Sequence, residues 1–116
     1  MITIYHNPRC SKSRNALSSI QNAEKEFKVV EYLSQQFSEE TLRSLLLKLN
    51  IRPEELVRKN EVIFQENFKG KTYNDVEWIK ILVENPKLIQ RPIVESNSRA
   101  IVARDEESVN YILNDK

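Results

Sequence analysis

The sequence predicts an α/β protein built on a mixed four-stranded sheet, and three observations lead to this class. The chain opens with a strand, helix and strand pattern over residues 2–32. A helix-rich stretch follows at about 38–85, and the last third then repeats strand, turn, strand and helix. A β-α-β unit followed by a β-β-α unit, with an inserted helical region between them, gives one sheet with helices packed on it.

The opening β-α-β pattern comes from a change in the spacing of apolar residues. Residues 2–6 alternate and are rich in β-branched and aromatic side chains, as in a strand. Asn7-Pro8-Arg9 interrupts this strand. A helix is expected over about 11–23, and residues 27–32 predict a second strand parallel to the first. The apolar face of the helix would consist of Ala16, Leu17, Ile20 and Ala23.

Helix signals dominate the middle of the chain and define the predicted insertion. Ser38 is a favourable N-cap for a helix that Asn50 ends, and leucines between them keep the i, i+3, i+4, i+7 spacing. Residues 60–74 are mixed and predict no regular element beyond a turn. Asn74 or Asp75 caps a further helix.

The last third of the chain predicts a β-hairpin and a closing helix. Residues 92–95 and 99–103 are short strands joined by the turn Ser96-Asn97-Ser98, so we expect them to pair antiparallel. Asp105 caps the final helix. The hairpin supplies the two strands that complete the predicted sheet.

Length and composition exclude several classes of protein. A chain of 116 residues fits one domain, so we expect a single domain over 1–116 with its helical insertion at about 38–85. The 18 basic and 17 acidic residues leave a net charge of +1, which gives no general attraction to nucleic acid. No apolar run reaches the ~20 residues that cross a bilayer, so we expect no membrane partner.

Residue counts also limit the possible sites. One cysteine and one histidine do not supply a zinc site, and one glycine does not supply a Gly-rich phosphate loop. A single cysteine forms no internal disulfide, and the N-terminus lacks the features of a signal peptide. We therefore expect a cytoplasmic monomer with no bound cofactor and no bound metal.

Cys10 is the strongest candidate for chemistry. It lies between a predicted strand end and a predicted helix start, where unpaired N–H groups favour an anion. Such a setting lowers a cysteine pKa from about 8.5 towards ~3.5–7.5 and produces a nucleophilic thiolate. A buried cysteine acting as a small hydrophobe is the alternative, but the polar residues 11–15 do not suit a core segment. Basic residues surround Cys10 in sequence: His6, Arg9, Lys12 and Arg14.

Two neighbours of Cys10 are further candidates. The position three residues on is Ser13, so no Cys-x-x-Cys disulfide forms and an external thiol must reset an oxidised Cys10. The Ser13 hydroxyl is expected to donate a hydrogen bond to the thiolate or to a bound anion. His6 has two interpretations, a residue that assists the thiolate or simply the polar end of the first strand, and the sequence leaves both open.

Three arginines border predicted elements: Arg58, Arg91 and Arg104. Planar guanidinium groups bind tetrahedral oxyanions through paired hydrogen bonds, whereas a solvated surface charge is the alternative for each. Arg91-Pro92 is also a candidate cis peptide that would turn the Arg91 backbone towards the thiol. Whether the three arginines converge does not follow from their spacing.

Three segments together resemble the glutaredoxin-coupled arsenate reductases. Residues 6–15, His-Asn-Pro-Arg-Cys-Ser-Lys-Ser-Arg-Asn, are similar to that family's His-Asn-Pro-x-Cys-x-x-Ser-Arg-Asn segment. Residues 56–60, Leu-Val-Arg-Lys-Asn, resemble its Leu-x-Arg-Lys-Asn segment. Residues 88–94, Leu-Ile-Gln-Arg-Pro-Ile-Val, resemble its Leu-Ile-x-Arg-Pro-Ile-Val segment, and Arg104 takes the place of its third oxyanion arginine. The matches run in order along nearly the whole chain.

The resemblance implies a thioredoxin-like fold with a cis proline at Pro92. It implies Cys10 as the nucleophile, His6 as a residue that keeps the thiol ionised, and three oxyanion ligands: Arg58, Arg91 and Arg104. In such enzymes the thiolate attacks arsenate, glutathione adds to the arsenic and reduces it, and glutaredoxin clears the remaining mixed disulfide. The resemblance therefore implies arsenate or a similar oxyanion as substrate, glutathione as co-substrate and glutaredoxin as partner.

Two other functions stay open on the sequence. One is a glutathione-linked thiol oxidoreductase that acts on mixed disulfides, which a reactive Cys10 without an arginine cluster would favour. The other is a non-enzymatic regulator of the Spx type that binds RNA polymerase. Such regulators often carry a Cys-x-x-Cys switch, which Ser13 interrupts in this chain.

Overall fold

The computed structural model describes residues 1–114, and the chain divides into two compact units. The first, which we call the sheet unit, comprises Met1–Gln35 and the residues from Arg91 onward. The second, the helical unit, is Gln36–Gln90, and the insertion expected at about 38–85 lies within it. The single-domain organisation stays a prediction, and the two units are described separately.

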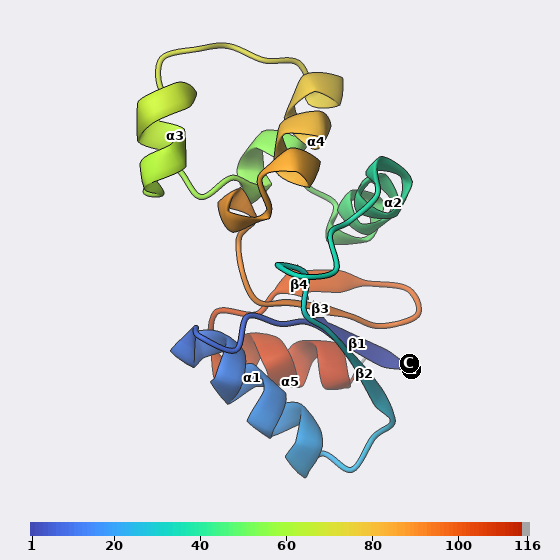
Figure 1. Ribbon diagram of the computed structural model, residues 1–116. Helices are drawn as coiled ribbons and strands as arrows, with labels where there is room; N and C mark the ends of the chain where they lie inside the picture. Colours follow the sequence, from blue (N-terminus) through green and yellow to red (C-terminus); the bar gives the residue numbers. More distant parts are fainter. Residues whose placement is uncertain (115–116) are drawn as a thin grey trace. The chain divides into compact units, whose positions relative to one another are not determined.

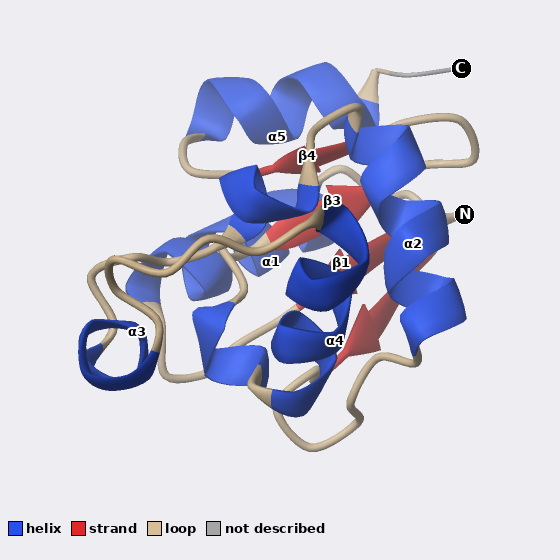
Figure 2. Ribbon diagram, turned by 90° about the horizontal axis from the view of Figure 1, so that it is seen from above, coloured by secondary structure: helices blue, strands red, loops and turns tan. Residues whose placement is uncertain are grey.

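The sheet unit contains the predicted mixed sheet of four strands, in the order β2-β1-β3-β4 (Figure 2). β1 pairs parallel with β2 and antiparallel with β3, and β3 pairs antiparallel with β4. The β-α-β and β-β-α halves therefore meet at the β1–β3 pair, which the sequence pattern did not specify. The elements of this unit are β1 (Ile2–Tyr5), α1 (Ser11–Asn22), β2 (Phe27–Val30), β3 (Ile93–Glu95), β4 (Ala100–Val102) and α5 (Glu106–Leu113).

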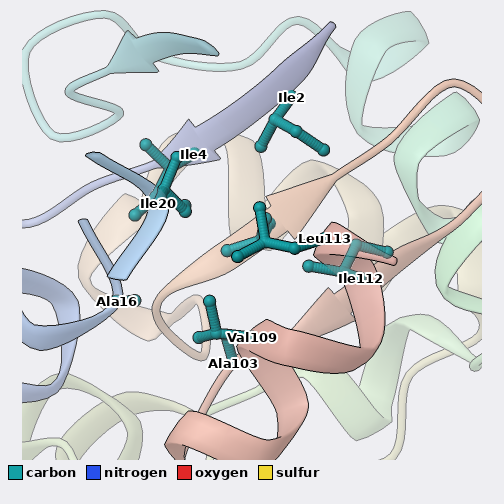
Figure 3. Packing of buried hydrophobic residues seen from close by; sticks show 9 residues of the cluster. Ile2, Ile4, Ala16, Ile20, Ala103, Val109, Ile112 and Leu113 are labelled. Atoms are coloured by element: carbon teal, nitrogen blue, oxygen red, sulfur yellow. The ribbon is translucent and has the colours of Figure 1, made fainter. Parts of the chain in front are cut away.

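Helices α1 and α5 lie side by side against one face of the sheet (Figure 1). Ile2 and Ile4 point to this face because residues two apart on a strand share a side. They pack against apolar side chains of both helices (Figure 3). This packing fixes the start of α1, where Cys10 lies, relative to the ends of β1 and β4. The buried cluster is Ile2, Ile4, Ala16, Ile20, Val94, Ala103, Val109, Ile112 and Leu113.

The helical unit is held by well-formed caps at its two longer helices. The Ser38 hydroxyl accepts the Thr41 N–H at 3.0 Å, and Asn50 ends the first helix with a left-handed φ of 56°. Asn74, rather than Asp75, is the second N-cap and forms a capping box with Glu77. The unit contains α2 (Glu39–Leu49), a 3-10 helix (Pro53–Leu56), α3 (Val62–Asn67), α4 (Asp75–Glu84) and a second 3-10 helix (Pro86–Leu88).

A short antiparallel contact within the helical unit holds the segment that leads to Arg58. Val57 and Ile89 form an isolated β-bridge. The Arg58 N–H donates to the Leu88 carbonyl at 2.7 Å, and the Gln90 N–H donates to the Leu56 carbonyl at 2.8 Å. These bonds fix the Arg58 backbone, so its side chain starts from a defined position.

Some details differ from the sequence-based expectations. Helix α3 was not predicted, because Phe64 is its one buried residue and a single apolar contact gives no periodicity. Ala23 was expected in the apolar face of α1, but it is exposed because it caps the helix after Asn22. Ser13 is buried on α1 instead. Within residues 1–114, no helix has the length and apolar character needed to cross a membrane.

Candidate active site

The loop between β1 and α1 holds Cys10 at the start of the helix. Cys10 is the N-cap of α1, with the extended backbone of a capping residue (φ −99°, ψ 124°). Its N–H donates to the Asn7 carbonyl at 3.0 Å, while the Asn7 side-chain oxygen accepts the Arg9 N–H at 3.0 Å. The Arg14 guanidinium donates to the Pro8 carbonyl at 2.9 Å. The loop is therefore closed on itself and presents a partly exposed thiol.

The surroundings of Cys10 favour its thiolate. Burial acts to raise the pKa of the thiol, but the backbone N–H groups of Ser13 and Lys12 and the Arg91 guanidinium outweigh it and lower the pKa. The N–H groups are those left unpaired at a helix start, and they stabilise negative charge. Arg91 adds a hydrogen bond and a full positive charge. A partly exposed sulfur with a lowered pKa is a nucleophile.

Ser13 and His6 form a buried pair behind the thiol. Ser13 is fully buried and His6 is nearly so, and their Oγ and Nδ1 atoms lie 2.7 Å apart. Ser13 Oγ also accepts the Asn7 N–H at 3.0 Å. The tautomer of His6 sets which of the two side chains donates in the His6–Ser13 hydrogen bond. Burial, together with the charge of Arg14 and against that of Glu31, lowers the His6 pKa, which favours the neutral form.

Ser13 therefore contacts the thiol differently from the expectation. Its hydroxyl, expected on the thiolate or on a bound anion, is engaged by His6 and Asn7. Its backbone N–H, at the start of α1, acts on the sulfur instead. His6 holds Ser13, so its position fits assistance to the thiol through Ser13 rather than through direct contact.

Arg91 reaches Cys10 because of the sheet register. Tyr5 pairs with Ile93 across β1 and β3, so the residues just before β3 lie beside the loop that follows β1. The Arg91–Pro92 peptide bond is cis, as expected. The Arg91 guanidinium acts on Cys10. The expected turn of the Arg91 backbone towards the thiol stays a prediction. Among the described residues, the buried Nε of Arg91 has no hydrogen-bond partner.

The other two arginines have different environments. Arg104 follows β4 and lines a cavity of about 330 Å³ together with Lys12. Arg58 belongs to the helical unit, where its Nη1 lies 2.6 Å from the Glu61 carboxylate, and both side chains are half-buried. The structure thus brings Cys10, Ser13, His6 and Arg91 together in the sheet unit. The convergence of Arg58 with the thiol stays a prediction.

The thiol loop, strand β3 and the arginine segments lie within one matching family model, which covers residues 5–112 and describes the ArsC family. The chain belongs to the ArsC family. The family assignment was expected from the three motif segments, and it is confirmed over almost the full length of the chain.

ArsC-family relatives match this chain over nearly its whole length. It is 40% identical over 114 residues to the uncharacterized protein YfgD of Escherichia coli strain K12, which covers 97% of this chain and 96% of the relative. It is 36% identical over 115 residues to an arsenate reductase of Acidiphilium multivorum, and the match covers 98% of this chain and 82% of that relative. The solved structure of an arsenate reductase from Vibrio cholerae has a TM-score of 0.89 and 35% identity, with 96% of each chain covered. The thioredoxin-like ArsC fold expected from the sequence is confirmed.

Two features near predicted site residues, one in each unit, were not foreseen from sequence. Glu61 pairs with Arg58, and the available signal was its i+3 spacing from the arginine. Lys12 and Asp105 face a common cavity although they belong to different helices. No local pattern links those two residues, so only the packing of α1 against α5 reveals them.

Proposed function

We propose that this ArsC-family protein reduces arsenate to arsenite through Cys10, with glutathione and glutaredoxin as reductants. One observation carries the proposal: a partly exposed thiol whose pKa is lowered by helix N–H groups and by the Arg91 guanidinium. Relatives that cover most of this chain are described as arsenate reductases, which supports the same activity.

The first step uses the thiolate and the nearby positive charge. Cys10 Sγ attacks the arsenic of arsenate, an S–As bond forms, and one arsenate oxygen leaves as water after protonation. Arg91, whose charge and hydrogen bond lower the pKa of Cys10, would stabilise the thiolate before attack and, as a proposed ligand, the oxyanion that approaches it. Oxyanion ligands of this kind need planar cations, and Arg104 and Arg58 are the other proposed ligands.

Reduction requires a second thiol, because the chain has one cysteine. Glutathione thiol bonds to the arsenic, and arsenic(V) takes up two electrons as the two sulfurs join. Arsenite leaves, and Cys10 keeps glutathione as a mixed disulfide. A glutaredoxin thiolate then attacks the glutathione sulfur and releases the Cys10 thiolate. The sum consumes arsenate and two thiols and yields arsenite, one disulfide and water.

The oxyanion must compete with Glu61 for Arg58. The Arg58–Glu61 pair is half-buried and short, so the Arg58 guanidinium is engaged by a carboxylate. An arsenate oxygen that binds Arg58 replaces or shares this carboxylate. Neutral His6 and buried Ser13 keep the start of α1 in place during these steps. We propose that the protein acts as a cytoplasmic monomer, where glutathione keeps such thiols reduced.

A coupled assay tests the proposal. Wild type and Cys10→Ser are compared for NADPH consumption with arsenate, glutathione, glutaredoxin and glutathione reductase present. We expect turnover in wild type and none in Cys10→Ser. Absence of turnover in wild type, with Cys10 still alkylated rapidly at pH 6, would contradict arsenate reduction and favour a mixed-disulfide substrate.

A further inference from the structure

A second feature of the sheet unit lies directly beside the thiol helix. A cavity of about 330 Å³ opens between α1 and the connection from β4 to α5. Lys12, Asn15 and Ser19 line it from α1, and Arg104 and Asp105 line it from the other side. Its volume is at the lower end of the ~300–1,000 Å³ range of small-molecule sites.

The lining is balanced in charge and rich in hydrogen-bonding groups. Two cations, Lys12 and Arg104, share the cavity with two carboxylates, Asp105 and Glu106. The Lys12 ammonium is close enough to contribute to the lowered pKa of the Asp105 carboxyl, after the larger contributions of the Ser108 hydroxyl and N–H. A ligand that carries both carboxylate and ammonium groups complements both signs of charge in this lining.

The polar side chains of α1 in this cavity are available to a ligand. Within residues 1–114, Asn15, Ser18 and Ser19 have no side-chain hydrogen-bond partner in the protein. Ala16, Ala103 and Val109 form an apolar floor beneath them. Polar groups without protein partners above an apolar floor are typical of a small-molecule site.

The position of the cavity relates it to Cys10. Helix α1 rises about 1.5 Å per residue, so Asn15 lies roughly 7–8 Å along the axis from Cys10. An extended tripeptide spans about 10 Å, which is longer than this rise along the helix axis. Because this chain has one cysteine, any oxidised or arsenic-bound Cys10 needs a thiol from outside. A ligand seated here would present that thiol at the start of the helix.

We propose that this cavity binds the low-molecular-weight zwitterionic thiol that resolves Cys10, with Lys12 on a carboxylate and Asp105 on its ammonium group, while Arg104 remains the proposed oxyanion ligand. The proposal rests on the proposed function only in requiring an external thiol, and it does not depend on arsenate. It gives Lys12 a role in binding the reductant, separate from the role of its backbone N–H at the sulfur.

The test uses S-methylglutathione, which has the charges of glutathione but cannot react. It is titrated into ¹⁵N-labelled wild type, Lys12→Gln, Lys12→Glu and the control Lys80→Glu, whose lysine is exposed on α4. We expect saturable shifts of the amides that line the cavity, with affinity about fivefold lower in Lys12→Gln and lower still in Lys12→Glu. Lys80→Glu should bind like wild type. Unsaturable shifts, equal binding by all four proteins, or displacement by inorganic phosphate at equal affinity would overturn the proposal.

A kinetic arm separates this proposal from the proposed function. In the coupled assay, Lys12→Gln should raise the KM for glutathione about fivefold. The alkylation rate of Cys10 should stay at the wild-type value, which checks that the thiolate is intact. Binding of S-methylglutathione without arsenate turnover would contradict the proposed function and leave the cavity assignment in place. Arsenate turnover with an unchanged KM for glutathione in Lys12→Gln would contradict the cavity assignment alone.

Discussion

Arg91 in the sheet unit and Arg58 in the helical unit are expected to perform the same task, yet their surroundings differ. Arg91 acts on Cys10, and its buried Nε has no partner among the described residues. Arg58 is bound to Glu61 at 2.6 Å. One guanidinium is thus committed to the thiol, whereas the other is held by a carboxylate that a ligand must displace. Removing each cation should therefore affect different steps.

The largest effect is expected for Arg91→Gln. Loss of the cation destabilises the thiolate, so the pKa of Cys10 rises and the alkylation profile moves to higher pH. Losing a hydrogen bond from a charged group should lower kcat/KM for arsenate between about ten- and a hundredfold. The matched variant Arg58→Gln should raise the KM for arsenate and leave the alkylation profile unchanged. A shifted alkylation profile in Arg58→Gln would show that the two arginines do not have separate roles.

Ser13→Ala tests the buried support of the sheet unit. The substitution leaves His6 Nδ1 and the Asn7 N–H without their partner, and each unsatisfied buried group costs ~1–3 kcal/mol. We expect the free energy of unfolding in urea to fall by about 2 kcal/mol. The exposed Ser44→Ala should change it by less than about 0.5 kcal/mol. Equal stability of Ser13→Ala and wild type would mean that the pair does not support the helix start.

Glu61→Gln tests the ion pair of the helical unit. Because half-exposed ion pairs are worth about 0.2–1 kcal/mol, releasing Arg58 should lower the KM for arsenate about two- to fivefold. Glu54→Gln is the control, since the Glu54–Lys59 pair is more exposed and involves no predicted ligand. A higher KM in Glu61→Gln would indicate that Glu61 positions Arg58 rather than competing for it.

The smallest effect is the pH dependence that comes from His6. Burial lowers the pKa of His6 in the folded protein from its ordinary value of 6.5, so the unfolded chain binds the proton more readily. This stability is fully present above about 6.5 and is lost as the pH falls from there through the lower folded pKa. In wild type, the free energy of unfolding in urea should be lower at pH 5.5 than at pH 7.5. This difference should be smaller in His6→Gln. An equal loss in both proteins would exclude His6 as the source.

Much of the fold could be predicted because its signals are local. The caps at Ser38 and Asp105 and the alternation of β1 each depend on residues a few positions apart. Within residues 1–114, the one α-helix that was not predicted lacks such a signal for a physical reason. Helix α3 buries one apolar residue, so it has no full apolar pattern.

The candidate site divides in the same way. The position of Cys10 at a helix start follows from the break at Asn7-Pro8-Arg9 and the polar helix that comes next. The partner of the Ser13 hydroxyl could not be predicted, because a hydroxyl three residues from a cysteine has several possible partners. Only the packing shows that His6 and Asn7 take it.

The sequence alone determined the order of strands and helices, the ArsC-family resemblance and a single thiol at the N-terminus of a helix. The tertiary structure decided which cation reaches that thiol, since the β1–β3 register places Arg91 beside the loop. It also decided that Arg58 is engaged by Glu61 and that α1 and α5 enclose a cavity of balanced charge. The reason is physical: periodicity and capping act within one element, whereas electrostatic partners are chosen by distance in space.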